Sequence, residues 1–196
     1  GYYLQDQIEL DNWTLVAGGR YDTARTRTDN YLSASHGVQD DEAFSGKIGL
    51  IYNFDNGIAP YASYSTSFLP VTGTGSNGNA FKPNTAQQRE VGVKYQPTGL
   101  DALFTLAWFD ITQKNVVTYA NALTSYQTGE QRSRGVEFET KMAVTDSINV
   151  TGAFTYTKAE VTKSLAVDAG QRPIGIPDYT ASLWADYTFR SGLMQG

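Results

Sequence analysis

The only histidine of the chain, His36, lies in a polar stretch shortly before an acidic run, Asp40-Asp41-Glu42. A histidine beside carboxylates could act as a general base or hold a metal ion. Either role needs partners, and no nucleophile motif accompanies this histidine. Cysteine is absent, which removes thiolate ligands and disulfides. We therefore interpret His36 as a solvated loop residue and expect no catalytic residue, no metal site and no resident cofactor.

A glycine-rich stretch at residues 72–79, with the sequence TGTGSNGN, resembles a phosphate-binding loop in composition. Such a loop joins a strand to a helix and usually ends in a lysine. No helical pattern follows here, and Phe81-Lys82-Pro83-Asn84 leads into another strand-like segment. The stretch is better interpreted as an external loop.

Aromatic residues in or beside the expected loops, with Phe68 at the tip of a strand-like segment, are better candidates for binding a ligand. They bury a large area while their hydroxyl groups bond polar ligand edges. The alternative is that they belong to a membrane girdle or brace neighbouring loops. Arg172 could attract an anionic complex, with plain surface solvation as its alternative. The candidate ligand-binding residues are Tyr31, Phe68, Phe81, Tyr119, Tyr126 and Arg172.

Strand-like segments must position these residues, because apolar and polar side chains alternate with a period of two along most of the chain. In residues 42–54, for example, Phe44, Ile48 and Leu50 share one face while Ser45 and Lys47 share the other. The pattern predicts nine strands, at residues 1–10, 12–27, 42–54, 57–68, 86–96, 101–118, 126–143, 147–162 and 177–190. Several exceed the usual length of about 5–6 residues in globular proteins.

The connections between these segments alternate in length. Tight turns are expected at residues 11–12, 55–57, 97–99, 145–146 and 191–192, and longer polar stretches at residues 28–41, 69–85, 119–125 and 163–176. In an up-and-down sheet every second connection lies at the same end. Short turns at one end and long loops at the other are typical of outer-membrane barrels. The sequence therefore predicts an all-β, antiparallel, transmembrane β-barrel wall, with the long stretches outside.

The polar faces of these segments carry repeated charges, as the wall of a hydrated lumen would. We expect these residues to pair with one another and to contact a domain inside the barrel. They are Arg20, Asp22, Lys47, Glu90, Lys94, Arg134, Glu137, Glu139 and Lys141. Aromatic residues recur near strand ends, as in an interfacial girdle. Asp110 shares a face with Phe104, Leu106 and Trp108, and we expect it beyond the membrane zone.

Composition sets further bounds. The net charge is −5, so no basic footprint indicates nucleic acid. No stretch approaches the roughly 20 apolar residues of a spanning helix, whereas barrel strands need only about 9–11 residues. An odd number of strands with one apolar face cannot end in open edges within lipid. We therefore expect residues 1–196 to be one section of a larger barrel.

Six segments together resemble TonB-dependent siderophore receptors, in particular those of the ferrichrome, or hydroxamate, type. The resemblance covers almost the whole chain. Its segments are Tyr3-Leu4-Gln5-Asp6-Gln7, Gly18-Gly19-Arg20-Tyr21-Asp22, Pro60-Tyr61-Ala62-Ser63-Tyr64-Ser65-Thr66-Ser67-Phe68, Glu90-Val91-Gly92-Val93-Lys94-Tyr95, Arg134-Gly135-Val136-Glu137-Phe138-Glu139 and Ser182-Leu183-Trp184-Ala185-Asp186-Tyr187-Thr188-Phe189.

The resemblance implies a 22-stranded barrel of the bacterial outer membrane, closed by a plug domain. In such a protein this chain forms an arc of the wall, and the plug and closing strands lie outside it. The implied function is uptake of a ferric siderophore, with iron carried only as part of that ligand. The implied partners are the siderophore, the TonB complex acting through the plug, and outer-membrane lipid. Two alternatives stay open, a passive porin and a β-rich surface adhesion module.

Overall fold

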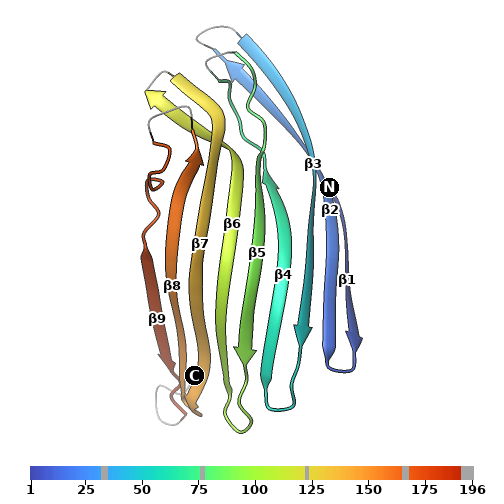
Figure 1. The fold of residues 1–196 in the computed structure, drawn as a ribbon, viewed down its shortest axis with the longest axis vertical. Coiled ribbons are helices and arrows are strands. Elements are labelled where there is room, and N and C mark those ends of the chain that lie inside the picture. The colour runs from blue at the N-terminus through green and yellow to red at the C-terminus, as the bar shows by residue number, and fades with distance from the viewer. Residues whose placement is uncertain (32–34, 76–77, 122–123, 165–167, 191–196) are drawn as a thin grey trace.

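The computed structural model describes residues 1–31, 35–75, 78–121, 124–164 and 168–190, which form one antiparallel sheet of nine strands. Each strand pairs with its neighbours in the chain, in the order β1 to β9 (Figure 1). The strands are β1 (Tyr2–Leu10), β2 (Trp13–Asn30), β3 (Ser35–Tyr52), β4 (Ile58–Leu69), β5 (Asn84–Tyr95), β6 (Ala102–Asn121), β7 (Thr124–Thr145), β8 (Ile148–Lys163) and β9 (Tyr179–Tyr187). All nine strands predicted from the sequence are confirmed. No helix in the described residues is long and apolar enough to cross a membrane.

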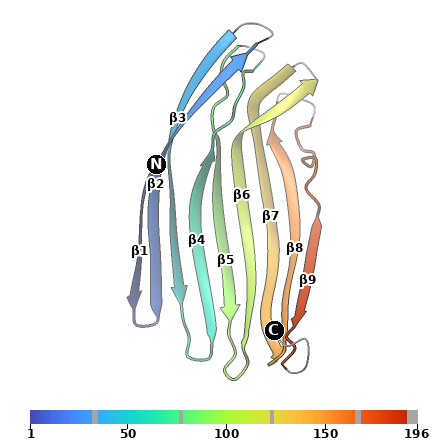
Figure 2. The same cartoon turned by 180° about the vertical axis from the view of Figure 1, so that it is seen from behind.

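The four tight turns within the described residues lie together at one end of the sheet, which we call the turn end (Figures 1 and 2). Two of them contain glycines in the left-handed region, Gly57 at φ 83° and Gly99 at φ 84°, where a Cβ would be strained. The turn at residues 191–192 lies outside the described residues. The remaining connections lie at the opposite end, the loop end, so the prediction that the tight turns share one end of the sheet is confirmed.

Two of the four stretches expected to be loops are instead mostly strand. The β2–β3 ladder continues to Asn30↔Ser35, and the β6–β7 ladder reaches Asn121↔Thr124. The expectation of loops at residues 28–41 and 119–125 was therefore wrong. Beyond a membrane both faces of a hairpin meet water, so polar residues occupy both faces and the apolar alternation disappears. Residues 70–83 and 164–178 lie outside the named strands where they are described.

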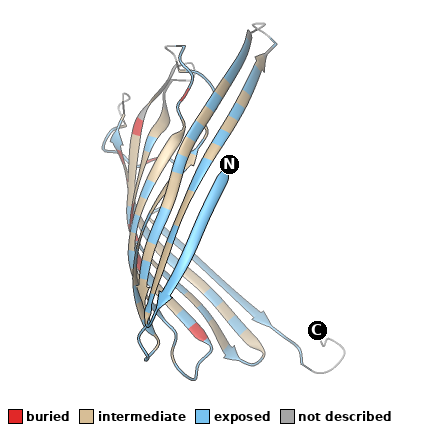
Figure 3. Cartoon of the chain, turned by 90° about the vertical axis from the view of Figure 1, so that its right-hand side faces the viewer, coloured by how far each residue is buried: buried red, intermediate tan, exposed pale blue. Residues whose placement is uncertain are grey.

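The sheet is a single curved layer (Figure 3). Its two faces differ chemically. Residues opposite each other in the ladders share a face, which links Ile48 to Tyr64 and Val91 to Trp108 on the apolar face. Large apolar side chains on this face stay open, as Leu106 does at 48% exposure. A continuous open apolar face of this size marks contact with another apolar phase. For strands that close a barrel, that phase is lipid.

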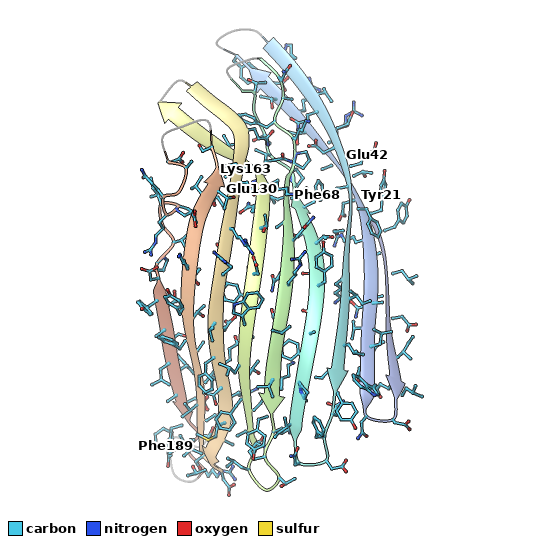
Figure 4. The ribbon with its side chains drawn as sticks, viewed as in Figure 1. Tyr21, Glu42, Phe68, Glu130, Lys163 and Phe189 are labelled. Atoms are coloured by element: carbon cyan, nitrogen blue, oxygen red, sulfur yellow. The ribbon has the colours of Figure 1, made fainter. Side chains whose placement is uncertain are left out.

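Aromatic rings gather on this sheet at its turn end. The Trp13 and Tyr52 ring centroids are 4.7 Å apart, and those of Tyr187 and Phe189 are 4.8 Å apart, both edge to face. Figure 4 shows Phe189 at this end of the sheet. Such rings are typical of a membrane interface, where the ring is apolar and its rim meets water.

Strands β3 and β4 separate toward the loop end. They pair only from Lys47↔Ser65 to Ile51↔Tyr61, although both strands continue further. Beyond this point β2 and β3 leave the sheet as a two-stranded ribbon (Figure 3). At the point of separation the Gly46 N–H donates to Thr66 Oγ1 at 2.9 Å, so a side chain replaces a missing ladder bond.

Candidate functional site

The polar face carries eight of the nine charged residues predicted to line a lumen. Ladder partners connect them across the sheet, because Lys47 lies opposite Ser65 and Ser63 lies opposite Glu90. Further along, Ala107 lies opposite Glu137. The eight residues are Arg20, Asp22, Lys47, Glu90, Lys94, Glu137, Glu139 and Lys141. Their contact with a domain inside the barrel stays a prediction.

Arg134 does not belong to this set. It lies opposite Asp110, on the face that also carries Val136 and Phe138. The prediction that Arg134 faces the lumen was wrong, because it rested on the charge of the residue and not on its position in the alternating strand. Position 134 is two residues from Val136, and residues two apart in a strand share a face.

Mutual pairing on the polar face is limited to one ion pair among the described residues. Arg20 Nε lies 2.6 Å from Asp22 Oδ2. None of the carboxylates of Glu90, Glu137 and Glu139 forms an ion pair with a described residue, and neither does Lys94. Most of the charge on this face is therefore left available to groups outside the described chain.

Glu90 is held in place at the centre of this face. The Tyr61 hydroxyl donates to its Oε1 at 2.7 Å, and the Gln88 amide donates to its Oε2 at 2.8 Å. The Lys94 Nζ lies 5.6 Å from the centroid of the Tyr61 ring, within reach of a cation–π interaction. The result is a fixed carboxylate with Glu137 two strands away on the same face.

At the loop end, a glutamine on β3 fastens the connection between β4 and β5. The Gln39 amide donates to the Phe81 carbonyl oxygen at 2.7 Å and to Asp41 Oδ2 at 2.9 Å. The Phe81 side chain is buried, and its ring lies against Gly73. The Gln127 amide bonds both backbone groups of Lys82. These contacts tie Phe81 and Lys82 to the β2–β3 and β6–β7 hairpins.

The structure separates the aromatic residues predicted to bind a ligand. Tyr31 is exposed, whereas Phe81 is buried with its ring against Gly73. Phe68 lies opposite Thr85 on the apolar face, near the loop end (Figure 4). Tyr119 and Tyr126 belong to the β6–β7 hairpin, and their side chains lie outside the described residues. Of the five, only Tyr31 is shown to have an open ring beyond the sheet. Ligand contact by any of the five stays a prediction.

The two remaining polar candidates have local partners. Arg172 forms an ion pair with Asp178, and this hydrogen bond raises the pKa of the guanidinium. His36 Nδ1 lies 2.6 Å from Asp29 Oδ1, and not beside the acidic run that follows it. No cluster of three or more metal-ligating side chains occurs among the described residues.

Sequence reasoning missed Tyr61, Gln39 and Gln127. Tyr61 shares the polar face of β4 with serines, and this break in its small-residue pattern was the available signal. The two glutamines lie in stretches interpreted as loops or loop borders. Nothing in the residue types identifies which distant backbone they would bond.

Sequence comparisons with a family model and with known proteins agree with one another. Residues 1–195 match the family model described as TonB dependent receptor-like, beta-barrel. The ferrichrome outer membrane transporter/phage receptor of Escherichia coli is 41% identical over 198 residues, covering 100% of this chain and 26% of that protein. The ferrioxamine B receptor of Salmonella typhimurium is 40% identical, covering 100% of this chain and 28% of the relative.

Solved structures show the same architecture. The siderophore receptor PiuA from Acinetobacter baumannii superposes with a TM-score of 0.75 at 26% identity, covering 94% of this chain and 30% of the other. The ferripyoverdine receptor of Pseudomonas aeruginosa gives a TM-score of 0.76 at 21% identity, covering 97% of this chain and 26% of the other, which supports the fold. The chain thus spans about a quarter of the length of the curated relatives that it matches.

Proposed function

Because the chain belongs to the TonB-dependent receptor β-barrel family of the bacterial outer membrane, we propose that it forms part of the wall of a receptor for ferric siderophores. The ligand class we propose is the hydroxamate siderophores, since relatives about 40% identical over the whole chain are a ferrichrome transporter and a ferrioxamine B receptor. The receptor would act in transport and not in catalysis.

One structural observation supports a plugged receptor over an open pore. Glu90, Glu137 and Glu139 lie on the polar face of the wall without an ion-pair partner among the described residues. Carboxylates grouped in a confined site repel one another, so they need cationic partners in addition to hydrogen bonds. A folded plug domain inside the barrel would supply such partners, with TonB acting through the plug.

The test is uptake of ⁵⁵Fe by iron-starved cells that carry or lack the full-length gene. We expect deletion to abolish uptake of ferrichrome or ferrioxamine B while uptake of a ferric catecholate continues. Loss of TonB should also abolish this hydroxamate uptake. Equal uptake of every ferric siderophore after deletion contradicts the proposal. Diffusion of small solutes through the purified protein, without dependence on TonB, would indicate a porin instead.

A further inference from the structure

One pair of neighbouring strands parts inside the wall. The β3–β4 ladder ends at Lys47↔Ser65, whereas the β2–β3 and β4–β5 ladders both continue toward the loop end. The two parting strands keep their other neighbours, so this split does not lie at an edge of the described sheet. Phe68, which Figure 4 labels, belongs to the part of β4 that has left β3. The split is thus a local feature of the wall itself.

A hollow of about 580 Å³ opens at the split, and residues of both faces line it. Phe44, Ile48 and Tyr64 line it from the apolar face. Lys47 and Ser67 line it from the polar face. In a sheet of a single layer, a hollow lined from both faces opens the wall from one face to the other. Its volume is within the usual range of small-molecule sites, about 300–1,000 Å³.

A second hollow, of about 320 Å³, adjoins the first and adds residues of the polar face such as Arg20 and Ser45. The two hollows share Gly18, Gly46, Lys47 and Thr66. Two of these shared residues are glycines, which have no side chain to close the opening. The two hollows together are called the wall passage below.

The two mouths of the wall passage differ in chemistry. The outer mouth is aromatic and aliphatic, and the Phe44 side chain there is 72% exposed. The inner mouth has N–H and O–H donors, from Lys47 and Ser45 among others. Lys47 forms no ion pair with any described residue. A molecule that satisfies both mouths needs an oxygen-rich head and an apolar tail.

We propose that the wall passage binds the acyl tail of an acylated ferric hydroxamate, with the chelate on the polar face and the tail reaching the apolar face. The proposal rests on the proposed function and narrows its ligand to an amphiphile. Amide and hydroxamate oxygens of the head can accept hydrogen bonds from the Lys47 ammonium and the Ser45 hydroxyl. Each methylene of the tail that leaves water for the aromatic mouth adds to the affinity.

A membrane lipid fits the wall passage less well. Its acyl chains already contact the apolar face from outside, so it has no need of the donors at the inner mouth. A ligand that arrives from the polar face uses both mouths, because its tail can leave water only by crossing the wall.

The test compares two probes, ferrioxamine B acylated at its terminal amine with an acetyl or a dodecanoyl group. Both carry the same chelate and the same charge. ⁵⁵Fe uptake is measured in iron-starved cells whose only hydroxamate receptor is the full-length protein. We expect half-maximal uptake of the dodecanoyl probe at no higher concentration than that of the acetyl probe. Ser67→Phe should raise this concentration roughly tenfold or more for the dodecanoyl probe alone, because the ring overfills the wall passage.

Two control variants accompany Ser67→Phe. Ser182→Phe places the same ring on the polar face of β9, opposite Ala153 and away from the split. It should change the uptake of either probe less than about twofold, as surface substitutions usually do. Ser67→Ala removes the hydroxyl group without filling the wall passage, so it should keep the uptake of both probes.

The position of the tail is tested directly in outer membranes. A dodecanoyl probe with a diazirine at the end of its tail is bound to the full-length receptor and activated by light. Mass spectrometry of the digested protein then locates the cross-links. We expect them in residues 44–48 and 64–68, which contribute the apolar lining of the split.

Four outcomes would overturn the proposal. They are uptake of the acetyl probe without the dodecanoyl probe, equal loss of both probes in Ser67→Phe, equal effects of Ser67→Phe and either control, and cross-links confined to other segments. Uptake of the acetyl probe alone refutes only this inference. Failure of the wild-type receptor to take up either probe or ferrioxamine B refutes the proposed function, and this inference with it.

Discussion

On the polar face two aromatic rings lie directly over glycines of the neighbouring strand. The Tyr61 ring covers Gly92, and the Phe109 ring covers Gly135. Phe109 is almost completely buried by this contact, although the sheet has a single layer. The glycine leaves room for the ring, and the ring shields backbone that would otherwise be open. This arrangement is also used in designed β-sheets.

Replacing Gly135 with alanine should therefore destabilise the wall. The added Cβ would lie 2.6 Å from Phe109 Cζ and would overlap the Tyr156 carbonyl oxygen. We expect a loss of about 1–3 kcal/mol in the free energy of unfolding, as for overpacked cores. Urea unfolding of the full-length protein in detergent measures it. Gly152→Ala is the control, because its Cβ would meet its nearest atom at an ordinary 3.4 Å. Equal stability of the two variants would contradict this account of Gly135.

The ion pair at the loop end of β7 and β8 predicts a pH dependence. Lys163, together with Thr162, holds the pKa of the Glu130 carboxyl below its ordinary value. A lowered folded-state pKa stabilises the fold above the unfolded value of about 4.3, and this contribution is lost as pH falls through the folded value. The thermal midpoint of the native protein should thus exceed that of Glu130→Gln at pH 7, with the gap closing toward pH 3. A constant gap would mean that the pair contributes nothing through its charge.

For single residues, the sequence predicts which face of the sheet a charged side chain occupies only where apolar neighbours alternate with it. Glu90 and Glu137 were assigned correctly to the polar face because apolar neighbours alternate with them. Arg134 was assigned to the wrong face. Two residues beyond the last apolar position the outer face also becomes polar, so a charge there no longer indicates the lumen. Ring-over-glycine pairs depend on ladder register, which composition does not reveal.

The longest hairpins extend well beyond the apolar belt, which is the part of the sheet that carries the open apolar face. In β2–β3, pairing continues for residues 23–29 and 36–42 with carboxylates, arginines and threonines on the two strands. Tyr21 marks the border, where its hydroxyl donates to Glu42 (Figure 4). Past this border the ribbon has two strands only, since β3 has already separated from β4.

Hydrogen exchange should show this boundary. We expect amides of residues 44–51 to exchange far more slowly than those of residues 36–42, which in turn exchange more slowly than an unstructured peptide. A two-stranded ribbon in water is only marginally stable, whereas the belt shares its strands with the whole sheet. Mass spectrometry of the full-length receptor after deuterium labelling resolves the two segments. Exchange of residues 36–42 at the unstructured rate would show that the ribbon is open in solution.

The strands within the belt could be predicted from the sequence because lipid and lumen impose opposite preferences on alternate residues. The ribbon could not, since water on both faces imposes none. Short turns were recognisable from Asn, Asp and Gly at positions such as Gly57, whose left-handed backbone restricts the residue type.

For the whole molecule, the open charges of the polar face suggest a plug whose fit depends on them. The variant Glu90→Gln/Glu137→Gln should lower ⁵⁵Fe uptake severalfold and raise sensitivity to an antibiotic too large for porins. Neutral amides still accept hydrogen bonds but no longer pair with cations. The control is Asp55→Asn/Asp146→Asn, which removes two carboxylates at the turn end. If the variant is made at normal levels and shows normal ⁵⁵Fe uptake and unchanged antibiotic sensitivity, these carboxylates do not hold a plug.

The two-residue repeat of the wall also constrains how such a protein can change over generations. Inserting a single residue into β6 between Phe104 and Trp108 would reverse the faces of every β6 residue on one side of it, and would turn either Phe104 or Trp108 toward the lumen. The β2–β3 ribbon has polar residues on both faces, so it accepts odd or even insertions alike. Related chains should therefore accumulate length differences in the ribbon, while the apolar part of the sheet tolerates substitution but almost never a change in length.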